Sequence, residues 1–229
     1  MVEKKEVESK RKNDATIEQE VIKRMGHISS ELAHDLRGPL QIIQNAIFLI
    51  QKNPENQILY EMVNHSISQA SDLLDRFRDF YKAHELSFLE IEPAKVVDLA
   101  LSELTIPDNI EIKKHLSNIP SVKLDPTKLA IAIRYLIKNA IEAMPKGGTI
   151  LIKSFEENEI IYYIIEDNGQ GISPEIAKII FTPFFANLKR GKGLGVPTAK
   201  RTIESHKGEL TFTSIVGEIT TFTIKIPRS

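Results

Sequence analysis

Apolar residues at helical spacing run through the first 85 residues and constrain the fold more than any other feature. Steps of three and four residues link the apolar positions of segment 17–50, and a second stripe of this kind covers 59–84. The segment 51–56 breaks the pattern between them. Two long helices joined by a short turn form a helical hairpin, and a single hairpin leaves its apolar stripe uncovered. We therefore expect two copies to pack as a four-helix bundle, which makes a homodimer through residues 14–85.

After residue 85 the pattern changes to short strands that alternate with helices. We expect strands near 86–91, 110–114, 149–155, 160–166, 209–214 and 220–226, and helices near 93–104, 126–144 and 196–205. Pro93 and the pair Asp125-Pro126 suit helix starts. Mixed helices and separated strand pairs indicate an α+β sandwich. The chain then divides into a charged lead-in or linker at 1–13, a helical domain at 14–85 and a mixed domain at 86–229.

Composition narrows the range of functions. The 229 residues carry 30 basic and 31 acidic side chains, a formal net charge of -1, so nothing in the composition favours nucleic acid as a partner. The absence of cysteine excludes disulfides, thiolate metal sites and cysteine nucleophiles. No apolar run approaches the roughly 20 residues that span a bilayer. We expect no membrane segment in this chain and a cytoplasmic location, alone or as the cytoplasmic part of a longer sensor.

His34 lies off the apolar stripe of the first helix and so points away from the core. A lone histidine on a helix is usually a solvated surface residue. Here the acid Asp35 follows directly, Arg37 is one turn on, and the pair Gly38-Pro39 comes next. Because proline removes a backbone hydrogen bond and crowds the preceding turn, we expect this pair to interrupt the helix beside an exposed nucleophile.

Four short motifs follow one another in the mixed domain. They are YLIKNAIEA at 135–143, EDNGQGI at 166–172, FTPFF at 181–185 and GKGLG at 191–195. Each alone is weak evidence, because most such matches mark an ordinary helix or loop. The last motif lacks the G-x-G-x-x-G spacing of a dinucleotide-binding fold and the Gly-Lys-Ser/Thr of a P-loop.

Together and in this order, the motifs resemble the N, G1, F and G2 boxes of the GHKL (Bergerat) ATP-binding fold. Histidine kinases, Hsp90-type chaperones, type II topoisomerases and MutL-type repair ATPases share that fold. The string His34–Leu40 resembles the H-box of sensor histidine kinases. The two resemblances cover nearly all of the chain after residue 14. They imply a sensor histidine kinase core that uses ATP and Mg²⁺ to phosphorylate its own histidine, and then passes the phosphate to the receiver domain of a response regulator in two-component signalling.

The resemblance also implies individual roles. His34 would be the phosphorylated residue, Asp35 the carboxylate that supports its imidazole, and Arg37 a further catalytic residue. Asn139 would be the ligand of Mg²⁺, a hard cation that prefers oxygen, and Asp167 would accept a hydrogen bond from the adenine amino group. The other nucleotide-binding residues that the resemblance implies are Glu142, Gly169, Gly171, Ile172, Phe184, Lys189, Lys192, Gly193, Leu194, Gly195 and Thr220.

Two positions depart from patterns known in related proteins. Gly38 stands where many relatives carry a Thr or Asn that places a dephosphorylating water, so the resemblance does not imply phosphatase activity. Tyr135 stands where hydrolytic GHKL enzymes place a water-activating Glu, which favours phosphoryl transfer over direct hydrolysis. The alternatives are a GHKL-type ATPase, a serine protein kinase with the same ATP fold, and a non-catalytic dimeric scaffold that binds nucleotide.

Overall fold

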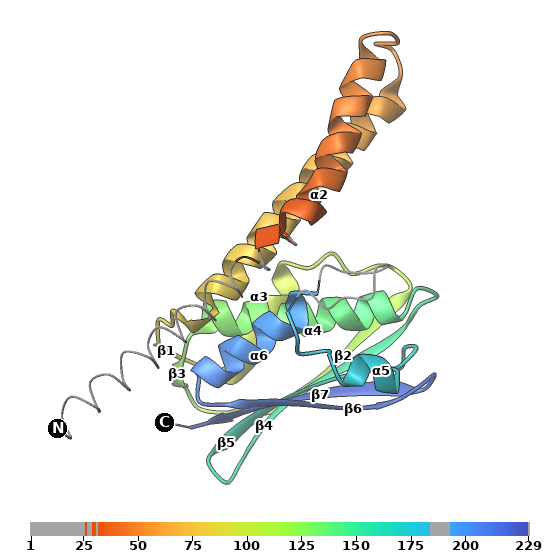
Figure 1. Ribbon diagram of the computed structural model, residues 1–229. Helices are drawn as coiled ribbons and strands as arrows, with labels where there is room; N and C mark the ends of the chain where they lie inside the picture. Colours follow the sequence, from red (N-terminus) through yellow and green to blue (C-terminus); the bar gives the residue numbers. More distant parts are fainter. Residues whose placement is uncertain (1–25, 27–28, 31, 184–192, 229) are drawn as a thin grey trace, which may run out of the picture. The chain divides into compact units, whose positions relative to one another are not determined.

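The computed structural model describes residues 26, 29–30, 32–183 and 193–228 (Figure 1). The chain divides into two compact units, Met1–Leu74 and Asp75–Ser229. The predicted lead-in at 1–13 and the beginning of the first apolar stripe lie outside the described residues. Within the described ranges, no helix is both long enough and apolar enough to cross a membrane.

The first unit holds a helical hairpin, as predicted. Residues 32–50 are helical, and after a turn at 51–56 the helix α2 occupies Gln57–Tyr81, with its last turns in the second unit. The side-chain oxygen of Asn56 accepts a hydrogen bond from the backbone N–H of Ile58 at 3.1 Å and so caps the start of α2. Many apolar side chains on the two helices are exposed, namely Leu40, Ile42, Ile47, Phe48, Leu49, Ile58, Tyr60, Met62, Ile67 and Leu74.

The predicted interruption at Gly38-Pro39 is wrong, because the helix continues through both residues. Pro39 is buried. Apart from the helix's own neighbouring backbone, nothing lies within 4 Å of the place where a Cβ on Gly38 would stand. A proline inside a helix removes one backbone hydrogen bond. When helical turns are formed on both sides of the proline, the result is a bend in the helix and not its end.

The second unit is an α+β sandwich built on a five-stranded sheet. The strand order is β2-β4-β5-β7-β6, with β2 at Ile110–Leu116, β4 at Gly148–Glu157, β5 at Ile160–Asp167, β6 at Glu209–Ile215 and β7 at Ile219–Pro227. β2 and β4 are parallel and the other neighbours are antiparallel. A separate two-stranded sheet pairs β1, Leu89–Ile91, with β3, Val122–Leu124.

Three helices cover one face of the large sheet (Figure 1): α3 at Pro93–Ser102, α4 at Pro126–Ala143 and α6 at Gly195–Ser205. The helical turns η1, Lys82–His84, and α5, Pro174–Ala177, complete the unit. Buried and half-buried residues alternate along β4, β5 and β7, as expected for a sheet with one face against helices. The predicted fold class is confirmed.

Several boundaries differ from the sequence-based expectation, and β3 and α5 were not predicted. The strand expected at 86–91 is only Leu89–Ile91, since the backbone N–H of Ser87 donates instead to Oδ2 of Asp125 at 2.6 Å. The second compact unit begins at Asp75, before the boundary expected near residue 86. The reason is that the end of α2 carries Asp79, which bonds to α4.

His206, which follows α6, is buried and joins α6 to the start of α4. Its Nε2 accepts a hydrogen bond from the backbone N–H of Asp125 at 3.1 Å, and its Nδ1–H donates to the carbonyl oxygen of Thr202 at 2.8 Å. This arrangement requires the neutral ring, because a protonated Nε2 cannot accept. Burial is the main cause that lowers the pKa of His206, against opposing effects of the Thr202 bond and the Asp125 charge.

Acid should therefore destabilise the second unit through His206. The pKa of His206 in the folded protein lies below its ordinary value of 6.5. Neutral His206 therefore contributes fully to the free energy of unfolding above pH 6.5, and this contribution is lost as the pH falls through the folded-state pKa. We expect the free energy of unfolding, from denaturant titrations between about pH 7.5 and 5.5, to fall more steeply in the wild type than in His206→Gln. Equal slopes for the two proteins would contradict the assigned neutral ring.

Candidate functional site

Helix α4 presents the first predicted nucleotide motif on its partly exposed side. The side chain of Asp125 caps its first turn. Leu136 and Ala140 are buried in the core, whereas Asn139 and Glu142 are half-buried. Residues three apart lie on the same side of a helix. Asn139 and Glu142 therefore offer an amide oxygen and a carboxylate from one face of α4.

The loop after β5 packs onto the end of that helix. Asp167 ends β5 and is buried, and its Oδ1 accepts a hydrogen bond from the backbone N–H of Gly169 at 2.9 Å. The backbone N–H of Gln170 donates to the carbonyl oxygen of Ala143 at 3.1 Å. A Cβ on Gly169 would stand only 2.9 Å from that same oxygen, so glycine allows the close approach. The predicted N and G1 motifs are in direct contact.

The described part of the last glycine motif also meets α4. Gly193 adopts a φ of +62°, Leu194 is buried, and Gly195 begins α6. A Cβ on Gly195 would stand 3.2 Å from Cδ1 of Tyr135, which lies one turn before Asn139. The G2 motif is thus placed beside the N motif through the Tyr135 ring. The predicted contacts Phe184, Lys189 and Lys192 lie outside the described residues.

Thr220, near the start of β7, is the cross-strand partner of Asp167 on β5. Directly opposed residues of antiparallel strands extend their side chains to the same face of the sheet. Both residues are buried. Burial, followed by the charge of Glu166, raises the pKa of Asp167 to about 6, although the Gly169 N–H works in the opposite direction. A carboxyl with this pKa is mostly ionised at neutral pH. Because it is buried, few water molecules can donate hydrogen bonds to it, so a donor group on a ligand would be a favourable partner.

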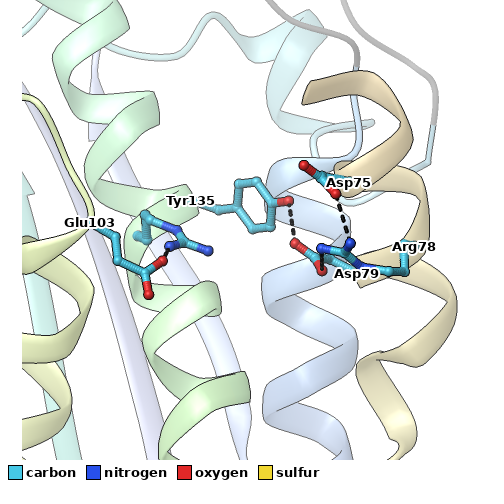
Figure 2. A network of polar contacts seen from close by, with 6 residues as sticks. Asp75, Arg78, Asp79, Glu103 and Tyr135 are labelled. Atoms are coloured by element: carbon cyan, nitrogen blue, oxygen red, sulfur yellow. Dashed lines mark hydrogen bonds and ion pairs between the residues drawn. The ribbon is translucent and has the colours of Figure 1, made fainter. Parts of the chain in front are cut away.

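The hydroxyl of Tyr135 has a buried acidic partner (Figure 2). It donates to Oδ2 of Asp79, near the end of α2, at 3.0 Å. Arg78 lies 3.4 Å from the other oxygen of Asp79 and 2.7 Å from Asp75. Arg134, the residue before Tyr135 on α4, forms an ion pair with Glu103. Burial is the main cause that raises the pKa of Tyr135, and the nearby Asp79 charge adds to it.

Sequence reasoning missed Asp79, which lies within the second predicted helix. No short-range signal marks it, because Asp79 and Tyr135 are 56 residues apart in the chain. Only the fold brings the end of α2 to α4. The same holds for Ser214 on β6, whose Oγ accepts a hydrogen bond from the backbone N–H of Ile172 in the G1 loop at 2.9 Å.

His34 lies on the first helix in the other compact unit. Its side chain is 74% exposed, and its Nδ1 lies 3.3 Å from Oδ1 of Asp35. A carboxylate at Nδ1 favours the tautomer with hydrogen on that nitrogen, which leaves the lone pair on Nε2. Arg37 is exposed on the same helix. The predicted contact between His34 and Asp35 is present.

Comparison with known proteins agrees with this geometry. Residues 124–229 match the sequence model of the family described as histidine kinase-, DNA gyrase B-, and HSP90-like ATPase. Sporulation kinase E of Bacillus subtilis is 25% identical over 99% of the chain, and the sensor histidine kinase ZraS of Salmonella typhi is 26% identical over 93%. A solved structure of the histidine kinase ThkA in complex with the response regulator protein TrrA covers 92% of this chain and 64% of that one, with 24% identity and a TM-score of 0.75.

Residues 124–229, within the second unit, are similar to the ATPase domains of the histidine kinase, gyrase B and HSP90 type. The chain as a whole is similar to the catalytic core of sensor histidine kinases, which confirms the predicted resemblance. It spans 31% of the length of sporulation kinase E and 48% of that of ZraS.

Removal of the Tyr135 hydroxyl should destabilise the second unit. Tyr135→Phe keeps the ring that packs at Gly195 but leaves the buried Asp79 without one of its donors, at a cost of about 1–3 kcal/mol in unfolding free energy. Denaturant titration measures this loss. Tyr162→Phe, on the half-buried side of β5, is the matched control and should change stability by less than about 0.5 kcal/mol. A Tyr135→Phe protein as stable as the wild type would contradict the energetic role of the Asp79 bond.

Adenine nucleotide affinity should depend on the ionisation of Asp167. An ionised carboxylate accepts a hydrogen bond from an amino group, and a protonated one loses part of that capacity. Because the pKa of Asp167 is about 6, ADP affinity measured by calorimetry should fall severalfold between about pH 7.5 and 5.5. Asp167→Asn is the control, because the ADP phosphates titrate in the same way with both proteins. The ADP affinity of this variant should change less with pH than that of the wild type. Parallel profiles would rule out Asp167 as the titrating group.

Proposed function

We propose that this chain is the catalytic core of a histidine kinase that transfers the γ-phosphate of ATP to His34 and then to an aspartate of a response regulator. One observation supports this proposal above the others. The G1 loop with the buried Asp167 packs on the end of α4, and Gly195 of the G2 motif lies beside Tyr135 of the N motif on the same helix. The same chain also carries an exposed histidine whose Nδ1 faces a carboxylate. The first arrangement fits a nucleotide site and the second fits a nucleophile.

The acceptor chemistry follows from the His34–Asp35 contact. With hydrogen on Nδ1, the lone pair of Nε2 attacks the γ-phosphorus, and the bond from phosphorus to the β,γ-bridging oxygen breaks to release ADP. The ring becomes positively charged when Nε2 bonds to phosphorus, and the carboxylate of Asp35 stabilises that charge. In the second transfer, an aspartate oxygen of the regulator attacks the same phosphorus and the nitrogen–phosphorus bond breaks.

The residues of α4 fit a Mg²⁺ ion that binds with ATP. Asn139 and Glu142 supply oxygen atoms, the ligand type that Mg²⁺ prefers. In the described part of the chain, no group of three or more His, Asp or Glu side chains could hold a metal ion by itself. This suits Mg²⁺, which usually binds through one or two protein oxygens together with substrate phosphates and water. When bound, the ion would offset phosphate charge during transfer.

Direct ATP hydrolysis is the less supported alternative. A hydrolase needs a base near the attacking water, and Tyr135 occupies the position where hydrolytic relatives of this fold carry Glu. The Tyr135 hydroxyl donates to Asp79 and its pKa is raised by burial, so it cannot act as a base near neutral pH. A serine kinase or a non-catalytic scaffold would have no use for the His34–Asp35 pair.

The proposal includes two protein partners. The apolar side chains exposed on both helices of the hairpin favour a second copy of the chain, since a homodimeric four-helix bundle would bury them. A response regulator would receive the phosphate from the exposed His34, and the solved complex of ThkA with TrrA provides the precedent for such a partner.

Autophosphorylation can be tested with γ-labelled ATP and Mg²⁺. We expect label that is acid-labile and alkali-stable on the wild type, because phosphate on a histidine nitrogen has these properties. His34→Ala and Asn139→Ala should each lose at least about 99% of the initial rate, since the first lacks the nucleophile and the second lacks the metal ligand.

His65→Ala is the matched control for the acceptor. His65 is an exposed histidine on α2 that bonds to Gln69 at 2.8 Å, and its substitution should leave the labelling rate within about twofold of wild type. Label that persists on His34→Ala would show that a residue other than His34 accepts the phosphate. Steady release of free phosphate without labelled protein would favour the ATPase alternative.

A further inference from the structure

Ser214, near the end of β6, connects the G1 loop with the start of strand β7. Its Oγ lies 2.9 Å from the backbone nitrogen of Ile172 in the G1 loop, 3.1 Å from the carbonyl oxygen of Ile219 and 3.0 Å from Oγ1 of Thr220. Ser214 is half-buried and Thr220 is buried. No sequence motif includes Ser214. It nevertheless contacts the loop that follows Asp167 and the strand β7 that pairs with β5 beside Asp167.

The direction of these hydrogen bonds follows from the number of hydrogens available. A serine hydroxyl donates one hydrogen bond and accepts two. The carbonyl oxygen of Ile219 can only accept, so it takes the Ser214 hydrogen, and the backbone N–H of Ile172 can only donate, so it fills one lone pair of Ser214. The remaining contact requires the hydroxyl of Thr220 to donate to Ser214.

This direction determines what Thr220 offers a ligand. Once its hydrogen is directed to Ser214, Oγ1 of Thr220 has only lone pairs for other partners. Asp167 stands opposite Thr220 in the strand register, and an ionised carboxylate likewise only accepts. The ends of β5 and β7 therefore present two acceptors side by side. They suit a base with an amino group at this point, such as adenine, and oppose guanine, whose carbonyl oxygen occupies the corresponding position.

We propose that Ser214 is a specificity-determining residue that favours adenine over guanine nucleotides by fixing the hydroxyl of Thr220 as an acceptor. The inference rests on the proposed function and extends it to a residue outside the nucleotide-binding motifs. Ser214 acts through Thr220 and the G1 loop and is therefore a positioning residue.

The hairpin between β6 and β7 keeps the G1 loop in place by other contacts as well. The backbone N–H of Gly217 donates to the carbonyl oxygen of Gln170 at 2.9 Å. Gly171 has a φ of +71°, and a Cβ there would stand 2.5 Å from the carbonyl oxygen of Ile215. These backbone contacts do not involve the Ser214 hydroxyl. Removal of that hydroxyl should therefore free Thr220 without detaching the loop.

The test compares ADP and GDP affinities by calorimetry in the wild-type chain and in Ser214→Ala. We expect the wild type to prefer ADP, and Ser214→Ala to lose roughly tenfold of that preference, the equivalent of one hydrogen bond. The loss should come mainly from weaker ADP binding, because the freed Thr220 hydroxyl can donate and no longer favours an amino group. Ser214→Thr keeps a hydroxyl and should restore the preference.

Two further variants make the outcome decisive. Ser205→Ala, which removes another half-buried serine hydroxyl, one that donates to the Arg201 carbonyl in α6, should leave both affinities unchanged. Thr220→Val should lower the preference for ADP as Ser214→Ala does, and it tests the proposal independently if Ser214→Ala does not fold. Equal weakening of ADP and GDP binding, or an unchanged ratio, would overturn the proposal. A wild type that binds neither nucleotide would overturn the proposed function itself.

Discussion

Helix α4 buries one face against the sheet and holds the nucleotide motifs against its other side. Two close contacts make this possible: Gly169 lies against the end of the helix, and Gly195 lies against the ring of Tyr135. A side chain at Gly169 would separate the G1 loop from α4, and bulk at Gly195 would press on Tyr135. The spacing of Asn139 from Asp167 thus depends on backbone packing before any ligand is considered, which is how a rigid scaffold places a binding site.

The same helix also receives the end of α2. That helix begins in the first compact unit and its last turns belong to the second, where Asp79 accepts the hydrogen bond of Tyr135. A buried carboxylate is costly unless it has donors, and both Tyr135 and Arg78 are close to this one. Within the second unit, Tyr135 therefore contacts the end of α2 through its hydroxyl and lies beside Gly195 through its ring.

The sequence predicted what local signals encode. The Asp125-Pro126 pair marked the start of α4, the apolar periods separated the hairpin from the sandwich, and the order of the boxes indicated the nucleotide site. Contacts between distant residues left no such signal: the Asp79–Tyr135 bond, the Ser214 contacts and the pairing of β3 with β1 depend on the final topology. The interruption expected at Pro39 failed for a different reason. Local propensity disfavours proline within a helix, but the turns formed on both sides outweigh one lost hydrogen bond.

The central claim is that a phosphate taken from ATP bound near Asp167 ends on His34. The direct measurement is tandem mass spectrometry of the chain after incubation with Mg²⁺ and ATP, with digestion kept alkaline so that phosphohistidine survives. The account predicts one phosphate on the peptide that contains His34, with fragment ions that place it on the histidine. Phosphate found on a serine, a threonine or a different histidine, with His34 unmodified, would contradict it.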